Sequence, residues 1–194
     1  MKIIGVQHDI VWENKPANFD KVLSLLGDIE ITPGSLIVLP EMFSTGFSMN
    51  VEKIRESRSH ETETFLCETA KRFASHVLGG LVTQTPDGRG RNEAVVADPS
   101  GKAIARYGKL HPFTFAGETK HYEPGDRLVT FPWGEFTVAP LICYDLRFPE
   151  VFRHAILRGA DLLVVIACWP QSREAHWTTL LSARAIENQP TPWA

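Results

Sequence analysis

The apolar residues of this chain fall into two kinds of pattern. Three short, nearly continuous apolar runs, KIIGVQ, SLIVLP and DLLVVIA, occupy residues 2–7, 35–40 and 161–167. Runs of this length, bounded by turn residues, are typical of strands buried on both faces. Other segments repeat apolar residues at three- and four-residue spacing, as helices with one buried face do. They cover residues 17–26, 61–73, 148–158 and 173–188.

The middle of the chain predicts antiparallel strands. The turn sequences PDG and DPSG, which favour tight reversals, separate three apolar stretches at residues 76–84, 91–98 and 102–109. Residues 128–143 predict a hairpin around Trp133 and Gly134. Residues 109–127 form a long polar and aromatic loop, and loops of that length in compact domains usually carry function.

The order of these elements indicates the fold class. Strands that alternate with helices favour an α/β protein in which helices cover the sheets. A length of 194 residues suits one domain with a substantial core. We therefore expect a single domain over residues 1–194.

Composition and charge exclude several function classes. The chain is 43% hydrophobic and 22% charged, and its net charge of -3 provides no basic surface for nucleic acid or an acidic membrane. No apolar run approaches the roughly 18 residues of a membrane helix, and the N-terminus lacks a signal-peptide pattern. Three widely spaced cysteines, Cys67, Cys143 and Cys168, fit neither a zinc site nor a disulfide scaffold. We therefore expect a cytoplasmic protein with reduced thiols.

Three of the strand-like runs end in a residue with reactive chemistry. SLIVLP is followed by Glu41, KAIARYG by Lys109, and TVAPLI by Cys143. In α/β proteins, functional sites gather at the carboxyl ends of strands, so these side chains can converge. Each residue also has an explanation without function. Glu41 could be a solvated carboxylate, Lys109 an ordinary lysine at a strand end, and Cys143 a small buried apolar residue.

Cys168 is the rival thiol, because it also follows an apolar run. Trp169 and Pro170 come next, however, and no helix begins there at once. Cys143 instead precedes a predicted helix, whose dipole and free backbone N–H groups would lower the thiol pKa and form an oxyanion hole. This difference favours Cys143 as the nucleophile.

A cysteine–histidine pair is one way to activate such a thiol, but the spacing selects none of the candidates, His111, His121, His154 and His176. A Cys–Glu–Lys set accounts for more of the sequence. The glutamate would take the thiol proton, and the lysine would stabilise negative charge on the substrate oxygen.

These segments resemble the nitrilase superfamily, the carbon-nitrogen hydrolases. VLPEMFSTGF, YGKLHPF and LICYDLRFPEVFR resemble the family segments with the catalytic glutamate, lysine and cysteine, which assigns those roles to Glu41, Lys109 and Cys143. GETKHYEPGD resembles the segment with a second, supporting glutamate, here Glu118. ARAIENQ resembles the helix end that follows. The segments occur in the family's order over nearly the whole chain.

The resemblance implies an α-β-β-α sandwich and amide hydrolysis without a metal or an organic cofactor. PEMFSTGFSM, ACWPQSREAHW and LICYDLRFPE look most like the omega-amidase branch. Its members hydrolyse the terminal amide of small 2-oxo dicarboxylic acid monoamides, such as 2-oxoglutaramate, to the acid and ammonia. The alternatives within the superfamily are an amidase that acts on deaminated glutathione and a carbamoylase.

The resemblance also implies a mechanism through a thioester. Glu41 accepts the proton of Cys143, and the thiolate attacks the amide carbon while Lys109 and the backbone N–H near Tyr144 bind the oxyanion. Glu41 then protonates the departing ammonia and activates water. Glu118 would orient Lys109 or polarise the site; without the resemblance it would be interpreted as a plain loop carboxylate.

Substrate-binding residues are less clearly marked. An omega-amide acid needs a partner for its carboxylate, and the guanidinium of Arg147 offers a bidentate donor. The alternative for Arg147 is a structural salt bridge with Asp145 or Glu150. Three aromatic residues are expected to line the pocket, although packing is the alternative for each: Phe43, Tyr122 and Trp169.

The chain departs from the family pattern after ARAIENQ. The family continues into a further strand and a C-terminal region used in dimer packing, whereas this chain continues PTPWA, and prolines cannot donate to a sheet ladder. We therefore expect a C-terminally incomplete sandwich, truncated after about residue 189, with poor stability and exposed apolar surface. A non-catalytic fragment is the alternative to an enzyme. For the full-length family, the resemblance implies homodimers or larger homo-oligomers.

Overall fold

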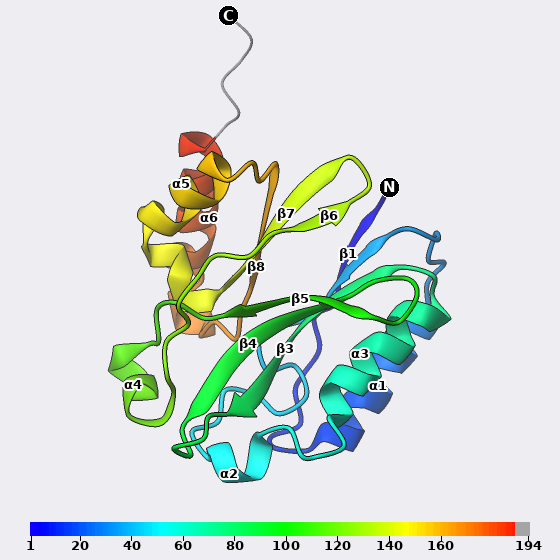
Figure 1. Cartoon of the computed structure of the whole chain (residues 1–194), viewed down its shortest axis with the longest axis horizontal. Helices are drawn as coiled ribbons and strands as arrows, with labels where there is room; N and C mark the ends of the chain where they lie inside the picture. The colour runs from blue at the N-terminus through cyan, green and yellow to red at the C-terminus, as the bar shows by residue number, and fades with distance from the viewer. Residues whose placement is uncertain (189–194) are drawn as a thin grey trace, which may run out of the picture.

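A computed structural model describes residues 1–188, which contain two β-sheets. The larger sheet has five strands in the order β1-β2-β3-β4-β5 (Figure 1). Its first three strands run parallel, and the last two continue the sheet in antiparallel register. The strands are β1 (Ile3–Gly5), β2 (Leu36–Val38), β3 (His76–Gln84), β4 (Gly90–Ala97) and β5 (Ala103–Gly108).

The smaller sheet has three strands in the order β6-β7-β8. The hairpin of β6 (Phe131–Trp133) and β7 (Phe136–Ile142) is antiparallel. Helix α5 (Pro149–Leu157) connects β7 to β8 (Leu162–Ile166), which pairs with β7 in parallel. A helical crossover of this kind is what a parallel pair of strands requires.

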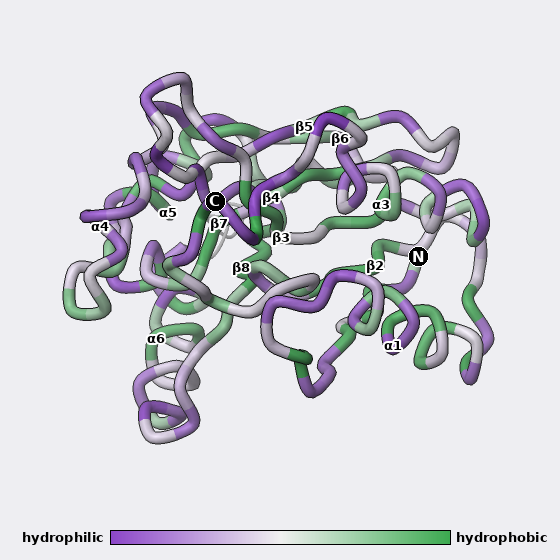
Figure 2. Tube along the Cα trace, turned by 90° about the horizontal axis from the view of Figure 1, so that it is seen from below, coloured by the Kyte–Doolittle hydropathy of each residue, from purple (hydrophilic) through white to green (hydrophobic). Residues whose placement is uncertain are grey.

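The two sheets pack face to face and bury one continuous core. Leu78 and Val96 of the larger sheet belong to the same buried cluster as Phe131, Val138 and Leu141 of the smaller sheet. In Figure 2 the hydrophobic parts of the trace run along the strands, and hydrophilic parts dominate the peripheral turns. Strands that are covered on both faces have continuous apolar sequences, as β2 (LIV) does.

Helices cover the outer faces of both sheets (Figure 1). Helices α1 (Lys15–Gly27) and α3 (Glu61–Arg72) lie against the larger sheet, where Val22 and Leu66 join its outer core. Helix α5 packs on the smaller sheet through Ala155, and α6 (Glu174–Glu187) packs beside it. The expected α/β fold, an α-β-β-α sandwich, is therefore confirmed.

The predicted strands and long helices are all present, with small shifts at their ends. The loop after β5 is more structured than expected, because it contains the 3-10 turn η1 (Thr114–Ala116) and the short helix α4 (Glu118–His121). The short helix α2 (Val51–Ile54) was not predicted. The expected departure from the family pattern near residue 189 lies outside the described residues.

Among the helices of residues 1–188, none has both the length and the apolar character that are needed to cross a bilayer.

Candidate active site

Each of the three expected catalytic residues stands just beyond the carboxyl end of a strand. Glu41 follows β2, Lys109 follows β5, and Cys143 follows β7. The first two strands belong to the larger sheet and the third to the smaller one, so face-to-face packing brings them together. All three side chains are buried; Glu41 is 0% and Lys109 1% exposed.

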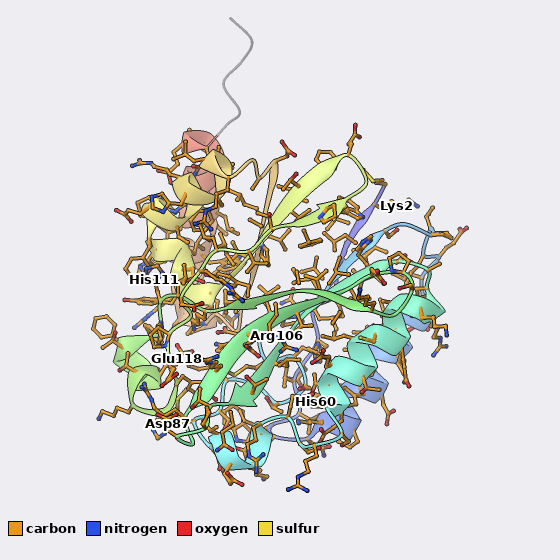
Figure 3. All side chains as sticks on the ribbon, in the orientation of Figure 1. Lys2, His60, Asp87, Arg106, His111 and Glu118 are labelled. Carbon is orange, nitrogen blue, oxygen red and sulfur yellow. The ribbon has the colours of Figure 1, made fainter. Side chains whose placement is uncertain are left out.

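Lys109 links two buried carboxylates. Its Nζ donates to Glu41 Oε1 at 3.0 Å and to Glu118 Oε2 at 2.8 Å. Glu118 is the first residue of α4 and is 0% exposed; its carboxylate also accepts a hydrogen bond from the backbone N–H of Phe113. Figure 3 shows Glu118 and His111 on the same side of the molecule, where the loop after β5 meets α4.

Two further groups hold the Glu41 carboxylate. The side-chain amide of Asn92, on β4, donates to Glu41 Oε1 at 2.7 Å, and the backbone N–H of Cys168 donates to Glu41 Oε2 at 2.8 Å. Neither contact was predicted. A single asparagine within a strand carries no motif, and Cys168 was considered only as a rival thiol.

The chain turns sharply at Cys143. This residue has a φ of 45°, in the left-handed region that non-glycine residues seldom adopt, and it begins the 3-10 turn η2 (Cys143–Arg147). The buried Asp145 carboxylate accepts from the backbone N–H of Ile142 at 3.0 Å and of His111 at 3.0 Å. Asp145 thus ties the cysteine turn to the loop that follows Lys109.

Burial and nearby charge keep both the lysine and the thiol protonated, although for different reasons. Burial alone would lower the pKa of Lys109, but the carboxylates of Glu41 and Glu118 outweigh it and raise that pKa well above its ordinary value. Burial, and then the charge of Glu41, raise the pKa of the Cys143 thiol well above its ordinary value. The expectation of a lowered thiol pKa is therefore wrong, and Cys143 is protonated near neutral pH.

The histidines do not form the alternative cysteine–histidine pair. His111 Nδ1 lies 2.8 Å from Asp145 Oδ1, and its ring stacks on Phe148 at 3.7 Å between centroids. His176 Nδ1 contacts the guanidinium of Arg147 at 3.2 Å. His121 and His154 are exposed.

A cavity of about 150 Å³ opens beside Cys143. Its wall includes both thiols of this region, Cys143 and Cys168, and is otherwise mainly apolar and aromatic. The aromatic lining residues are Phe47, Phe113, Tyr144 and Trp169. A small apolar cavity with a nucleophile at its wall and a few polar groups is the usual form of a small-molecule site.

Two arginines supply positive charge to this cavity, Arg147 and Arg173. The guanidinium of Arg147 lies over the ring of Trp169 at 5.3 Å, and that of Arg173 lies over the ring of Phe113 at 5.6 Å. Within residues 1–188, neither guanidinium forms a salt bridge, and Asp145 is engaged by Tyr107 and His111 instead. Arg173 was not among the expected site residues.

The expected pocket-lining aromatics divide into two groups. Trp169 does line the cavity, and so does Tyr144, for which only a backbone contact was expected. Phe43 instead lies in the outer core of the larger sheet, 5.7 Å from the ring of Phe65, and Tyr122 is fully buried with its hydroxyl donating to Ser48 O at 2.6 Å. The expectation that Phe43 and Tyr122 line the pocket is therefore wrong.

Known proteins share both the sequence and the fold of this chain. The chain is 39% identical over 191 residues to the omega-amidase YafV of Yersinia enterocolitica, an alignment that covers 97% of this chain and 71% of that protein. It is 33% identical to the 2-oxoglutaramate amidase of Bacillus subtilis (strain 168), covering 95% of this chain and 71% of that protein.

Solved structures agree with this relationship. XC1258 of Xanthomonas campestris, a CN-hydrolase superfamily protein with an arsenic adduct in its active site, superposes with a TM-score of 0.87 at 31% identity, covering 96% of this chain and 71% of that one. Nit3 of Saccharomyces cerevisiae, of branch 10 of the nitrilase superfamily, gives 0.83 at 25% identity, covering 97% and 72%. Residues 4–190 match the model of the carbon-nitrogen hydrolase family. The chain belongs to the carbon-nitrogen hydrolase family and is an enzyme of its amidase class.

Proposed function

We propose that this protein is an omega-amidase, which hydrolyses the terminal amide of a small 2-oxo dicarboxylic acid monoamide to the acid and ammonia. The observation that carries the proposal is the placement of Cys143 at the wall of a small cavity that also contains Arg147 and Arg173. The thiol offers a nucleophile for an amide carbon, and the arginines offer partners for a carboxylate at the other end of the same molecule. The names of the similar proteins support the same substrate class.

In the first half of the proposed reaction, Glu41 accepts the proton of Cys143 as the sulfur attacks the amide carbon. A base is required because burial keeps this thiol protonated. Glu41 is suited to the role, since its carboxylate is fully buried and accepts hydrogen bonds from Lys109 and the Cys168 backbone. The negative charge that develops on the carbonyl oxygen is stabilised by the Lys109 ammonium and the backbone N–H near Tyr144.

In the second half, the carbon–nitrogen bond breaks, and Glu41 returns its proton to the departing ammonia. The product is a thioester between the acyl group and Cys143. Glu41 then removes a proton from water, the hydroxide attacks the thioester carbon, and the acid leaves as the thiol is restored. One acid–base group serves both halves because it alternates between its protonated and ionised forms.

Glu118 acts in this scheme through Lys109. Its carboxylate holds the ammonium at 2.8 Å from one side while Glu41 holds it at 3.0 Å from another. Two fixed acceptors leave the lysine few directions in which to point. Glu118 therefore keeps the charge of Lys109 where the oxyanion forms.

The substrate carboxylate is assigned to the two arginines. Arg147 is four residues after Cys143 and lies on the cavity wall, as does Arg173. Two guanidinium groups can share one carboxylate, or one can bind the carboxylate while the other binds the adjacent 2-oxo group. Kinetic comparison of 2-oxo acid amides with amides that lack the oxo group separates these arrangements.

The direct test is ammonia release from 2-oxoglutaramate. The wild-type chain is expected to release ammonia, and Cys143→Ala to release none. Cys168→Ala is the matched control, because it removes the neighbouring thiol of the same cavity. A folded protein that releases no ammonia from any omega-amide contradicts the proposal.

A substrate panel tests the alternatives within the superfamily. Deaminated glutathione, N-carbamoyl amino acids and 2-oxo acid monoamides would be compared by kcat/KM under one condition. The omega-amidase proposal requires the 2-oxo acid monoamides to rank first. Preference for either of the other classes would reassign the substrate while retaining the cysteine chemistry.

The proposed reaction needs no metal or organic cofactor, and its partner is a small amide rather than a nucleic acid or a membrane. Assembly as a homodimer or a larger homo-oligomer, and a cytoplasmic location, stay predictions. Sedimentation analysis of the purified chain tests the first, and fractionation of the source cells tests the second.

A further inference from the structure

Asn92 is the one neutral side chain, within residues 1–188, that donates to both buried carboxylates of the site. It lies on β4, is 2% exposed, and its Nδ2 donates to Glu41 Oε1 at 2.7 Å and to Glu118 Oε1 at 3.0 Å. Lys109 Nζ contacts the same two oxygens, at 3.0 and 3.1 Å. The amide and the ammonium thus share both acceptors.

The other oxygen of this amide is left without a partner. Asn92 Oδ1 is buried and accepts no hydrogen bond in the described structure. Reversing the amide would not repair this, because it would place Oδ1 against two carboxylate oxygens. The negative charge of the two carboxylates therefore determines the orientation of the amide, with its N–H groups toward them. In this orientation Asn92 Oδ1 stays buried without a hydrogen-bond donor.

Asn18 shows how a buried asparagine with a structural role is satisfied. It is 0% exposed, and its Oδ1 accepts from the backbone N–H of Val11 at 2.7 Å. Its Nδ2 donates to the carbonyl oxygens of Val11, Asn14 and Ser44. Every polar atom of Asn18 is used to hold backbone, whereas Asn92 leaves its acceptor unused and directs both donors at charged groups.

We infer that Asn92 is a positioning residue for the amidase reaction, which fixes the Glu41 carboxylate relative to Glu118 and Lys109. The inference rests on the proposed roles of those three residues. A planar amide sets the angle between its two N–H bonds, so the two acceptor oxygens are held in a fixed relation. Lys109 contacts the same two oxygens, but its ammonium has three rotatable donors and so does not set the angle between them as a planar amide does.

The constraint matters because Glu41 must exchange protons first with Cys143 and then with the leaving group and water. Its Oε1 is occupied by Asn92 and Lys109, and its Oε2 receives the backbone N–H of Cys168. With Oε1 fixed, Oε2 is the oxygen available to exchange protons with Cys143 and the leaving group. Loss of the amide donor leaves a carboxylate that can rotate, and small misplacements of a reacting group reduce rates strongly.

The test compares Asn92→Leu, which keeps the size of the side chain without donors, with Asn18→Leu as a control for the loss of a buried asparagine. We expect Asn92→Leu to lower kcat for 2-oxoglutaramate by about 100-fold with little change in KM. Asn18→Leu is expected to lower the free energy of unfolding without changing kcat. For each variant, kcat is divided by the folded fraction, which circular dichroism measures. Asn92→Ser, which keeps a single donor, replaces the leucine variant if that variant does not fold.

Asn92→Asp tests the contact on which the inference rests, that the side chain at position 92 faces both carboxylates of the site. The new carboxylate would face Glu41 and Glu118, and Lys109 is the sole cation among these contacts. The other titratable groups in the same electrostatic environment are the thiols of Cys143 and Cys168 and the hydroxyl of Tyr122. We expect this variant to lose stability relative to wild type as the pH rises above about 4, where a free aspartate ionises. A parallel stability profile would contradict the inference.

The outcomes separate the inference from the proposed function. If the wild-type chain releases no ammonia from omega-amides, the proposed function fails whatever Asn92 does. If the wild type is active and Asn92→Leu or Asn92→Ser keeps its kcat, the positioning role of Asn92 is overturned and the proposed function stands.

Discussion

Tyr107 donates a hydrogen bond of 2.7 Å from its hydroxyl to Asp145 Oδ2, and both side chains are fully buried. Tyr107 lies two residues before Lys109, and Asp145 lies two residues after Cys143. The bond therefore joins the strand that delivers the lysine to the turn that delivers the thiol. Since the two elements belong to different sheets, this contact fixes the site across the interface of the sandwich.

Removing that hydroxyl tests the link. Tyr107→Phe leaves one acceptor position of Asp145 unfilled, and we expect the free energy of unfolding to fall by about 1–3 kcal/mol. Urea denaturation measures the change. The control is Ser182→Ala, which removes an exposed hydroxyl bonded within α6 and is expected to change stability by less than about 0.5 kcal/mol. Equal effects of the two substitutions would count against a structural link at Tyr107.

Gly80 provides the space in which the Glu41 backbone sits. A Cβ atom at this position would lie 2.4 Å from Met42 N and 2.7 Å from Glu41 Cα. We therefore expect Gly80→Ala to push Glu41 out of place, to cost about 1–3 kcal/mol of stability, and to lower kcat by about 100-fold.

Gly5 is the matched control for Gly80, because it also lies in a strand of the larger sheet and a Cβ atom there would meet nothing within 4 Å. Gly5→Ala is expected to keep both activity and stability. Steady-state kinetics and urea denaturation on the two variants decide the matter, and an active Gly80→Ala protein would refute the close-approach explanation.

Stability should fall at alkaline pH. Burial raises the pKa of Cys143 and Cys168, with the Glu41 carboxylate as the next cause, and burial also raises the pKa of Tyr107 and Tyr122. Above about pH 9 these groups ionise in the unfolded chain while they stay protonated in the folded one. The folded state then binds more protons, so the free energy of unfolding decreases as the pH rises.

The measurement is urea denaturation between about pH 8 and pH 10.5, where the thiols and phenols of an unfolded chain ionise. Cys168→Ser should show a shallower decline than the wild type, because it removes one of the contributing groups. A wild-type stability that is flat across this interval would mean that these groups ionise equally in the folded and unfolded chains.

Arg147 and Arg173 should affect charged substrates selectively. Replacing either by Ala removes a charged donor of the kind that contributes about 1.5–3 kcal/mol, which corresponds to a roughly ten- to hundred-fold lower kcat/KM for 2-oxoglutaramate. A short neutral amide has no carboxylate to lose contact with, so its kcat/KM should change little. An equal loss on both substrates would assign these arginines to the architecture of the cavity rather than to carboxylate binding.

Much of the candidate site follows from local sequence patterns. The stretches before Glu41, Lys109 and Cys143 predict strands, because a continuous apolar run and apolar residues between turn sequences are both local signals of a strand. The position of each residue at a strand end follows at once. What the runs could not specify is which strands are neighbours, since that depends on contacts between residues far apart in the chain.

Asn92 and Arg173 were missed for this reason. Asn92 reaches Glu41 across 51 residues of sequence, and nothing near it in the chain distinguishes it from an ordinary strand residue. Phe43 and Tyr122 were assigned to the pocket because they lie near the site segments in the sequence. An aromatic residue at such a position can face either the core or the cavity. Whether they face the core or the cavity is decided by the packing of the layers.

Cys143 shows the same division most clearly. The sequence by itself determined that a thiol ends a buried strand and precedes a helix, because strand and helix signals are local. It predicted a lowered pKa, since the dipole and free backbone N–H groups of a following helix stabilise a thiolate. The tertiary structure decided otherwise: packing of two sheets excludes water and places the Glu41 carboxylate nearby, and these non-local effects raise the pKa.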